Sequence, residues 1–479
     1  MLDLALFAFV MGLLALGVKR PFLWVLAYIY IDILAPQKIG WSITAALPLS
    51  LIAFCAAFAG WLLADSKRGS RFTYRQFLML LLLIYSGWTT LNADFPEPAL
   101  EKWGWVWKAL VFAIFLPLTL TTRLRIEAAA LVMLLTAGAI IISGGIKTAL
   151  GGGGYGGLHL FVNDNSGVYE SSTLATIAVA IIPLALWFTR HGTIFPPDWR
   201  VKAFAYALIF ACLLIPVGTE ARTGLLCIAV LAVLLLRDAR RRLAYIAGGA
   251  ALALVALPFL PQSYYERMAT IGEHEGDESA STRVAVWDWT LDYVQENPLG
   301  GGFDAYRGNS FTYDIPVVTG EGNNRAIRSE AVTDEARAYH SAFFEVLGEQ
   351  GWPGFLVWMA LQASGLWQME RLRRRWRVPD PPSPGKGDAE PPEAASIDIW
   401  QAPLASALQL AQIVYLVGAL FQGIAYQPFI LMLIGLQIGL WSYCRRRDSA
   451  RVQRETRERR TAPLASDADR TGLTPSALP

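Results

Sequence analysis

The chain has 479 residues, of which 54% are hydrophobic and 17% are charged, and its mean hydropathy is +0.38. A soluble domain carries roughly 25% charged residues, so this composition excludes an ordinary soluble enzyme and predicts a polytopic membrane protein in a lipid bilayer. The formal net charge of +2 is too small to indicate a partner, and we expect no nucleic-acid binding.

Apolar runs of about 18 residues are long enough to cross the hydrocarbon core of a bilayer. Reading such runs against polar breaks predicts an all-α protein with about thirteen transmembrane helices. Their expected positions in chain order are 2–18, 21–35, 44–64, 75–92, 103–121, 126–146, 168–189, 201–218, 221–236, 243–260, 352–369, 402–420 and 427–443. The second, eighth and ninth runs are short, so one of them is a candidate for a broken or re-entrant element.

Lysine and arginine residues cluster in every second connection between these runs. The basic connections contain Lys19 and Arg20, Lys67 to Arg75, Arg123 and Arg125, Arg190 to Lys202, Arg237 to Arg242, Arg371 to Arg377, and the C-terminal tail. Because basic loops remain in the cytoplasm, this alternation predicts an N-terminus outside and a C-terminal tail in the cytoplasm.

The connections also divide the chain into regions. We expect an N-terminal transmembrane region at 1–190 and a core region at 191–443, which includes one large loop with short helices on the outer side at 261–351. Loops of this length are usually functional. The Pro-rich segment 378–400 reads as a disordered cytoplasmic linker, and the basic segment 444–479 as a disordered cytoplasmic tail.

Several common chemistries leave no trace in the sequence. The four cysteines lie in or at the ends of expected spans, which does not indicate a disulfide framework. There is no Walker A motif, no CxxC pair and no HExxH motif, and the histidines lack the spacing of zinc ligands. We therefore expect neither an ATP-driven pump nor a bound metal or other cofactor.

Four polar clusters lie at the expected outer ends of spans, where charge in a membrane protein usually has a function. The first, "GGGGYGGLHLFVNDNSGVYESS" (151–172), contains Asp164, Asn165 and Glu170, and is either a flexible turn or a close approach to a ligand. The second, "GTEARTGLL" (218–226), contains Glu220 and Arg222. Arg222 either extends to the membrane interface or binds a phosphate through its planar guanidinium group.

The other two clusters belong to the expected large loop. "STRVAVWDWTLDYVQENPLGGGFDAYRG" (281–308) predicts an amphipathic helix with Arg283 near its start and Trp287 on one face, ended by Pro and Gly. Its alternative is a helix lying on the membrane surface. "AYHSAFFEVLGEQGWPGFLVWMALQASGLW" (338–367) places His340 before an apolar span, as a ligand, a base or an ordinary interfacial residue.

Each cluster alone has an ordinary structural explanation, but the expected topology places all four on one face of the membrane. Two guanidinium groups, one imidazole and an acidic loop beside a bilayer suit one task. That task is the handling of a lipid whose headgroup is a phosphate or a diphosphate.

The quoted segments resemble, in order and spacing, the core of the O-antigen ligase and polysaccharide polymerase superfamily. The family pattern has an arginine at an outer helix end, then "R…W…ENP…G.G", then "H[NS]…L…G..G"; the matching positions here are Arg222, Arg283 and His340. The segment "GVKRPFLWVLAYIYIDILAPQKIGWS" (17–42) is similar to O-glycosylation ligases associated with exosortase systems. Two departures are "HS" in place of the commoner "HN", and Glu170 where the family usually has apolar residues.

This resemblance implies a GT-C-like helical glycosyltransferase of the inner membrane that works on the periplasmic side without a metal. It would move a glycan from an undecaprenyl-diphosphate carrier to a hydroxyl group of a protein, lipid or glycan acceptor. Arg222 and Arg283 would stabilise the leaving diphosphate and His340 would act as the base. Glu220 or Glu170 are alternatives as the base or as the group that orients His340. The expected substrate-binding residues are Asp164, Asn165, Glu170 and Trp287.

Other functions remain open at this stage. A polysaccharide polymerase shares these motifs and differs in its acceptor. A lipid-glycan transporter often shows internal repeats with matched broken helices, and we find no repeat between the two halves. A non-enzymatic scaffold is a third alternative, which the grouping of arginine and histidine on one face weakly opposes.

Overall fold

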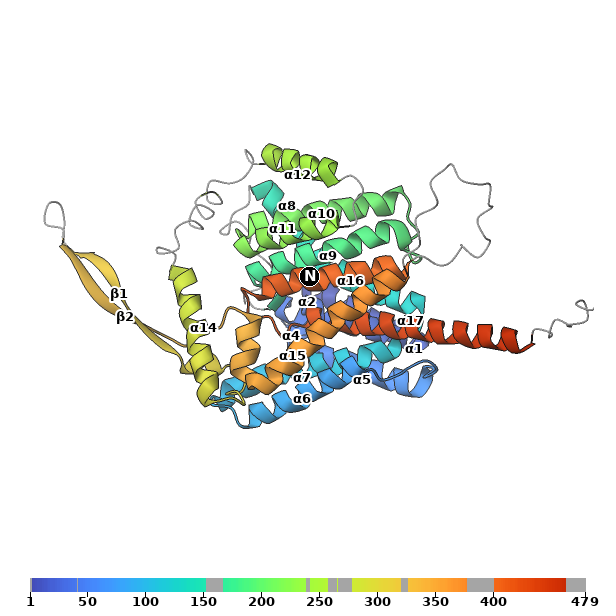
Figure 1. Ribbon diagram of the computed structural model, residues 1–479, viewed down its shortest axis with the longest axis horizontal. Helices are drawn as coiled ribbons and strands as arrows, with labels where there is room; N and C mark the ends of the chain where they lie inside the picture. The colour runs from blue at the N-terminus through green and yellow to red at the C-terminus, as the bar shows by residue number, and fades with distance from the viewer. Residues whose placement is uncertain are drawn as a thin grey trace, which may run out of the picture.

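The computed structural model describes residues 2–40, 42–151, 167–237, 242–256, 265, 278–319, 326–376 and 400–461. Within these ranges the chain is mostly a bundle of helices (Figure 1). Two of the predicted site residues, Asp164 and Asn165, lie outside the described residues, as does nearly all of the expected linker at 378–400.

The N-terminal half of the bundle is formed by helices that begin at caps or prolines and run through apolar sequence. Its helices are α1 (Leu2–Lys19), α2 (Phe22–Leu34), α3 (Pro36–Ile39), α4 (Ile43–Ala46), α5 (Leu49–Ala64), α6 (Tyr74–Leu91), α7 (Pro96–Thr119), α8 (Arg123–Gly151) and α9 (Ser171–His191), with a 3₁₀ turn η1 (Gly167–Tyr169). At α6, for example, Thr73 and Gln76 form a reciprocal capping box. The first residue of α7 is proline, a residue whose missing N–H is not needed at this position.

The C-terminal half adds further helices and a small sheet. Its elements are α10 (Trp199–Gly218), α11 (Arg222–Leu236), α12 (Arg242–Ala256), α14 (Glu278–Glu296), the 3₁₀ turn η4 (Ala305–Gly308), β1 (Ser310–Thr319), β2 (Ala326–Glu335), α15 (Ala342–Arg375), α16 (Gln401–Ala419) and α17 (Pro428–Thr461). Each of the thirteen expected spans coincides with one of the helices, although the third is divided between α4 and α5.

Six helices of the described chain are long and apolar enough to cross a membrane by themselves, namely α1, α8, α9, α10, α16 and the first part of α17. The protein is therefore a largely helical, multi-pass membrane protein. A total of about thirteen crossings and a GT-C-like arrangement stay predictions. In the most apolar segment of each span, 89% of the residues are buried in α9 but only 11% in α1. Helix α9 therefore lies at the centre of the bundle and α1 at its edge.

Two elements differ from the expected organisation. Helix α17 continues to Thr461, through residues expected to begin a disordered tail at 444. Cys444 is fully buried, and Arg375 of α15 pairs with Asp448 at 3.2 Å, so packing and charge both stabilise the longer helix. Residues 462–479 lie outside the described part.

The second difference is a β-hairpin inside the long loop, where only short helices were expected. Strands β1 and β2 pair antiparallel from Ser310 opposite Glu335 to Thr319 opposite Ala326. The hydroxyl groups of Thr312 and Thr333 lie 3.0 Å apart across this pair. The hairpin projects from one end of the bundle beside α14, and the last turns of α17 extend from the opposite end (Figure 1).

The basic connections meet at the α17 end of the bundle, which we call the basic end. Arg125 holds Asp65 through two contacts of 2.5 and 2.7 Å. Arg446 donates to the carbonyl oxygens of Gly69 and Thr121 at 2.6 and 3.1 Å. These contacts bring together connections that are far apart in the sequence, in agreement with the alternation of basic loops.

The other connections meet at the hairpin end, which we call the loop end. The Tyr169 hydroxyl donates to the carbonyl oxygen of Leu34 at 2.6 Å, which joins the start of α9 to the end of α2. The amide of Asp94 donates to Gly301 at 2.9 Å, which joins the α6–α7 connection to the long loop. All predicted site residues within the described chain belong to connections or helix starts at the loop end.

Candidate functional site

His340 lies in the turn immediately before α15, at the loop end. Its φ of +47° is in the left-handed region, which is uncommon for a residue with a side chain. The neighbouring Tyr339 and Ser341 are 3% and 1% exposed, whereas His340 is exposed. Such a backbone conformation persists only when the surrounding structure determines it, and here two buried neighbours present the imidazole toward the surface.

Trp287 of α14 holds this turn from one side. Its indole N–H donates to the carbonyl oxygen of Tyr339 at 2.9 Å, and its ring stacks on Phe344 of α15 at 5.0 Å with an interplanar angle of 4°. The amphipathic helix expected from residue 281 is thus present as α14, and it packs against α15. The described contacts of Trp287 are with the protein, and its contact with substrate stays a prediction.

Two of the predicted site residues, Arg283 and Glu170, lie close enough to His340 to affect its pKa. Partial burial, followed by the positive charge of Arg283, lowers the pKa of His340. Glu170 opposes this shift by raising the pKa, and Arg337 adds to the lowering. A lowered pKa keeps the imidazole neutral near neutral pH, which is the state that a general base requires.

Glu170 has a structural role at the start of α9, the central helix. Its carboxylate accepts hydrogen bonds from the amides of Ser172 and Thr173 at 3.1 and 2.6 Å, and from the Thr173 hydroxyl at 2.5 Å. Glutamate here replaces the usual Ser, Thr, Asp or Asn cap, and it leaves a negative charge facing the positive end of the helix. The departure from the family pattern at Glu170 is therefore explained, in this chain, by helix capping.

Arg222 is the first residue of α11, and Glu220 lies in the turn before it. Glu220 is 6% exposed and has a φ of +50°. A methyl group on Gly224 would meet Ala175 at 3.0 Å, so the first turns of α11 and α9 are in close contact. This contact brings Arg222 to the same level as Glu170, although neither Arg222 nor Glu220 is among the charges that most affect His340 in the described chain.

A buried group of charges at the loop end was not predicted from the sequence. We call it the ionic cluster, and its members are Lys102, Asp304, Glu345 and Glu349. The Lys102 ammonium lies 2.6 Å from Glu349 and 2.7 Å from Glu345, and 3.8 Å from Asp304. Glu349 is completely buried. Glu345 and Glu349 are four residues apart on α15, a spacing that places both on one helix face. That spacing was visible in the sequence, whereas the partner Lys102, from α7, was not.

A glycine-rich turn wraps around the ionic cluster and fixes the shape of α15. Glycine is required at 300 because its φ is +85° and a side chain would meet the backbone nitrogen of Gly351 at 2.4 Å. The amide of Gly302 donates to the Glu349 carbonyl at 2.9 Å, and that of Asp304 donates to the Glu349 carboxylate at 3.0 Å. At Gly351 α15 is kinked, which separates a short first half from the long apolar second half.

Charge balance in the ionic cluster is incomplete. Three carboxyl groups share one ammonium group, and the deepest of them is Glu349. Burial raises the pKa of Glu349 and the negative charge of Glu345 adds to this, while Lys102 opposes the shift. A raised pKa is the expected response of a carboxyl group that has lost its hydration and has to share its counter-ion.

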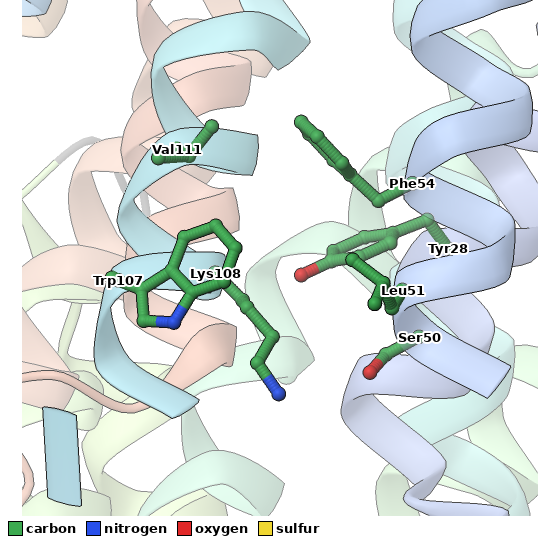
Figure 2. A pocket seen from close by; sticks show the side chains of 7 residues that line it. All are labelled: Tyr28, Ser50, Leu51, Phe54, Trp107, Lys108 and Val111. Carbon is green, nitrogen blue, oxygen red and sulfur yellow. The ribbon is translucent and has the colours of Figure 1, made fainter. Parts of the chain in front are cut away.

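A separate groove lies in the N-terminal half, between α2, α5 and α7 (Figure 2). Its walls are mainly apolar and aromatic, and its polar groups are Tyr28, Ser50 and Lys108. Lys108 reaches from α7 toward the side on which Ser50 lies, and the hydroxyl of Tyr28 points from α2 toward α7 (Figure 2). The groove contains none of the predicted site residues, so it is distinct from the loop-end site.

Comparison with known proteins adds to this geometry. Residues 204–359 match the family described as O-Antigen ligase, and residues 1–193 match a family of unknown function, DUF5935. The search of curated proteins found no match. The O-Antigen ligase match contains Arg222, Arg283 and His340, and it supports the resemblance of residues 204–359 to the O-antigen ligase superfamily. Within the described residues, no group of three or more His, Cys, Asp or Glu side chains could hold a metal ion.

Proposed function

We propose that the protein transfers a glycan from an undecaprenyl-diphosphate carrier to an acceptor hydroxyl at the periplasmic face of a bacterial inner membrane. The observation that carries this proposal is that His340, exposed in the left-handed turn before α15, is under the electrostatic influence of Arg283 and Glu170 at the loop end, in and beside the segment that matches the O-antigen ligase family. The identity of the donor, the identity of the acceptor and a relationship to exosortase-associated O-glycosylation ligases all belong to this proposal.

Bond cleavage at the donor makes the diphosphate a leaving group and builds negative charge on its oxygens. Fixed cations speed this step because they bind the developing charge more strongly in the transition state than in the ground state. Arg283 lies near His340, and Arg222 opens α11 beside the start of α9. Their planar guanidinium groups can each hold two phosphate oxygens, a geometry that a lysine ammonium does not offer.

The acceptor hydroxyl loses its proton as it attacks the anomeric carbon. His340 is the best base for this step, because its side chain is exposed and its pKa is lowered. The proton passes to the imidazole, the new glycosidic bond forms, and the bond to the carrier diphosphate breaks. A single displacement of this kind inverts the configuration at the anomeric carbon.

The two glutamates are weaker candidates for the base. Both oxygens of Glu170 already accept hydrogen bonds from the first turn of α9, so the group would have to release a helix cap to take a proton. Glu220 is nearly fully buried in a turn with a left-handed backbone. Glu170 is better suited to orient the imidazole and to stabilise the imidazolium ion that forms.

A polysaccharide polymerase is the second candidate function, because the sequence motifs resemble a superfamily that includes both kinds of transfer, which differ in the acceptor. Mass spectrometry of surface glycans, glycoproteins and lipid-linked intermediates in a deletion strain distinguishes them. For the ligase we expect the lipid-linked glycan to accumulate and a defined acceptor to be left bare. Loss of chain length with a modified acceptor would indicate a polymerase, and an unchanged glycan profile would refute both.

The orientation is tested separately. A reporter enzyme fused within the hairpin connection at 320–325 should be active only in the periplasm, and one fused after residue 461 only in the cytoplasm. A hairpin reporter located in the cytoplasm would contradict the proposed site of transfer.

A further inference from the structure

We propose that Lys102 of the N-terminal region is a positioning residue for the His340 turn, and that it acts by neutralising the buried carboxylates of Glu345 and Glu349. This inference rests on the proposed function only where it concerns transfer; the structural part concerns the position of the turn. It gives the region that matches a family of unknown function a definite task toward the O-antigen-ligase-like segment.

Lys102 is the shared counter-ion of two buried carboxyl groups on α15. Glu345 is 5% exposed and Glu349 is completely buried, and Lys102 lies within 2.7 Å of both. Removing one partner of a buried ion pair leaves an uncompensated charge and is strongly destabilising. Without Lys102 these carboxyl groups, which lie on the same face of one helical turn, lose the cation that opposes the rise in the pKa of Glu349. They then either repel each other or take up a proton or water, and the first half of α15 leaves its packed position.

The first half of α15 is connected to the catalytic turn. The amide of Glu345 donates to the carbonyl oxygen of Ser341 at 2.8 Å, so Glu345 closes the first helical turn after His340. A methyl group on Gly348 would meet the Tyr339 hydroxyl at 2.4 Å, so the Tyr339 ring lies against the same half-helix. A movement of this half-helix would therefore release both residues that flank His340.

The cation and the carboxyl groups of the ionic cluster come from different regions of the chain. Lys102 comes from α7, within the N-terminal match, whereas Asp304, Glu345 and Glu349 come from the segment that matches the ligase family. Lys102 also lies over the rings of Phe303 and Tyr426, at 5.4 and 6.0 Å from their centroids. The N-terminal region thus supplies the counter-ion on which the buried position of α15 depends.

The structural test measures the turn without relying on glycan transfer. Ser341 is 1% exposed, so a Ser341→Cys variant, made with Cys55→Ser to remove the exposed native thiol, should react slowly with a membrane-impermeant maleimide. Adding Lys102→Met should increase the labelling rate at least about tenfold, because buried positions react through local opening. Lys108→Met, six residues further along α7 and outside the ionic cluster, is the matched control and should leave the rate unchanged.

A charge-balanced variant separates neutralisation from a loss of the side chain alone. Lys102→Met combined with Glu349→Gln retains the net charge of the ionic cluster, and it should return the labelling rate to within about threefold of the parent. If Lys102→Met does not accumulate in the membrane, accumulation of the double variant with a slowly labelled thiol at position 341 supports the inference. Equal labelling of Lys102→Met and its parent, or failure of the double variant to restore protection, would overturn it.

Transfer supplies the second readout, in membranes that contain the accumulated lipid-linked glycan. Lys102→Met should lower kcat while leaving the KM for the donor nearly unchanged, because the arginines that would bind the diphosphate lie outside the ionic cluster. If Lys102→Met labels faster at position 341 but keeps a normal kcat, the positioning role is refuted. If instead the parent protein itself transfers no glycan, the proposed function fails while the labelling result on Lys102 still stands.

Discussion

The loop end and the basic end of the bundle both contain several charged side chains, yet they use them differently. At the basic end cations outnumber their acceptors: Arg125 holds Asp65 through two contacts, and Glu370 accepts from both Arg373 and Arg374. At the loop end charges converge, with three carboxyl groups around Lys102. A second group, around His340, combines cations with one carboxylate.

The charges at the basic end help to fix the arrangement of the loops, whereas those at the loop end are arranged as in a functional site. At the basic end the surplus of cations keeps the basic loops together on one side, and its more exposed ion pairs contribute little energy. Converging charges in a partly buried place shift pKa values and cost free energy, and such arrangements are typical of functional sites. The comparison therefore predicts that substitutions at the loop end affect transfer, whereas equivalent substitutions at the basic end do not.

The largest effect is expected from the arginines. Arg283→Ala and Arg222→Ala should each reduce transfer by about a thousandfold, because each removes a fixed charge that stabilises the leaving diphosphate. Transfer is measured as labelled acceptor formed in membranes, normalised to the protein inserted. Lysine at either position should restore little activity, since a point charge cannot replace the planar guanidinium fork. Wild-type turnover in Arg283→Ala would remove that residue from the mechanism.

The next largest effect is expected at the turn itself. His340→Ala should lower the rate of transfer by about a hundredfold, the usual contribution of a general base. Because His340 is exposed and its neighbours form the packing contacts, insertion into the membrane should be unaffected. An active His340→Ala enzyme would direct attention to Glu170 as the base, and the Glu170→Gln variant then provides the comparison.

A smaller effect is expected in the pH dependence of transfer. The base must be neutral, so the rate falls as pH decreases through the pKa of His340, which is already lowered by burial and by positive neighbours. Arg337→Gln removes one of these neighbours and should move the acidic limb to higher pH. Glu170→Gln removes the opposing negative charge and should move it to lower pH. Shifts of a few tenths of a pH unit are expected for partly exposed groups, and shifts in the same direction would refute the assignment.

The smallest effect is expected at the basic end. Arg125→Gln breaks the contacts with Asp65 but leaves the loop-end charges in place. Transfer per inserted protein should stay within about twofold of the parent, because these contacts lie at the opposite end of the bundle from the loop-end charges. A large loss of transfer would mean that the two ends are coupled, and would contradict the expectation that substitutions at the basic end leave transfer unaffected.

Much of the site was visible in local sequence. The apolar runs predicted a helix at each expected span, and the basic connections predicted which ends of these helices lie together. The pattern after Arg283 predicted α14 and its end at Pro and Gly. The role of Glu170 was not visible, because glutamate is not a usual cap and only the backbone of Ser172 and Thr173 reveals it.

Other features depend on contacts between distant segments. The hairpin was missed although Phe311, Tyr313, Ile315 and Val317 alternate along β1, a pattern typical of a strand, because β2 has no such pattern and the two strands stabilise each other only when paired. The ionic cluster was missed because a single lysine near the start of an apolar run reads as an interfacial residue. Its meaning appears only when Glu345 and Glu349, more than 240 residues away, are found beside it.

By itself, the sequence determined the membrane character, the helices and the side of the bundle to which each connection belongs. These follow from hydropathy and from basic residues, which are local properties of the chain. Tertiary structure decided which charges share a site: it placed Arg283 and Glu170 near His340, and Lys102 beneath the turn that bears it. Electrostatic coupling depends on distance in space and on burial, and neither is encoded by separation along the chain.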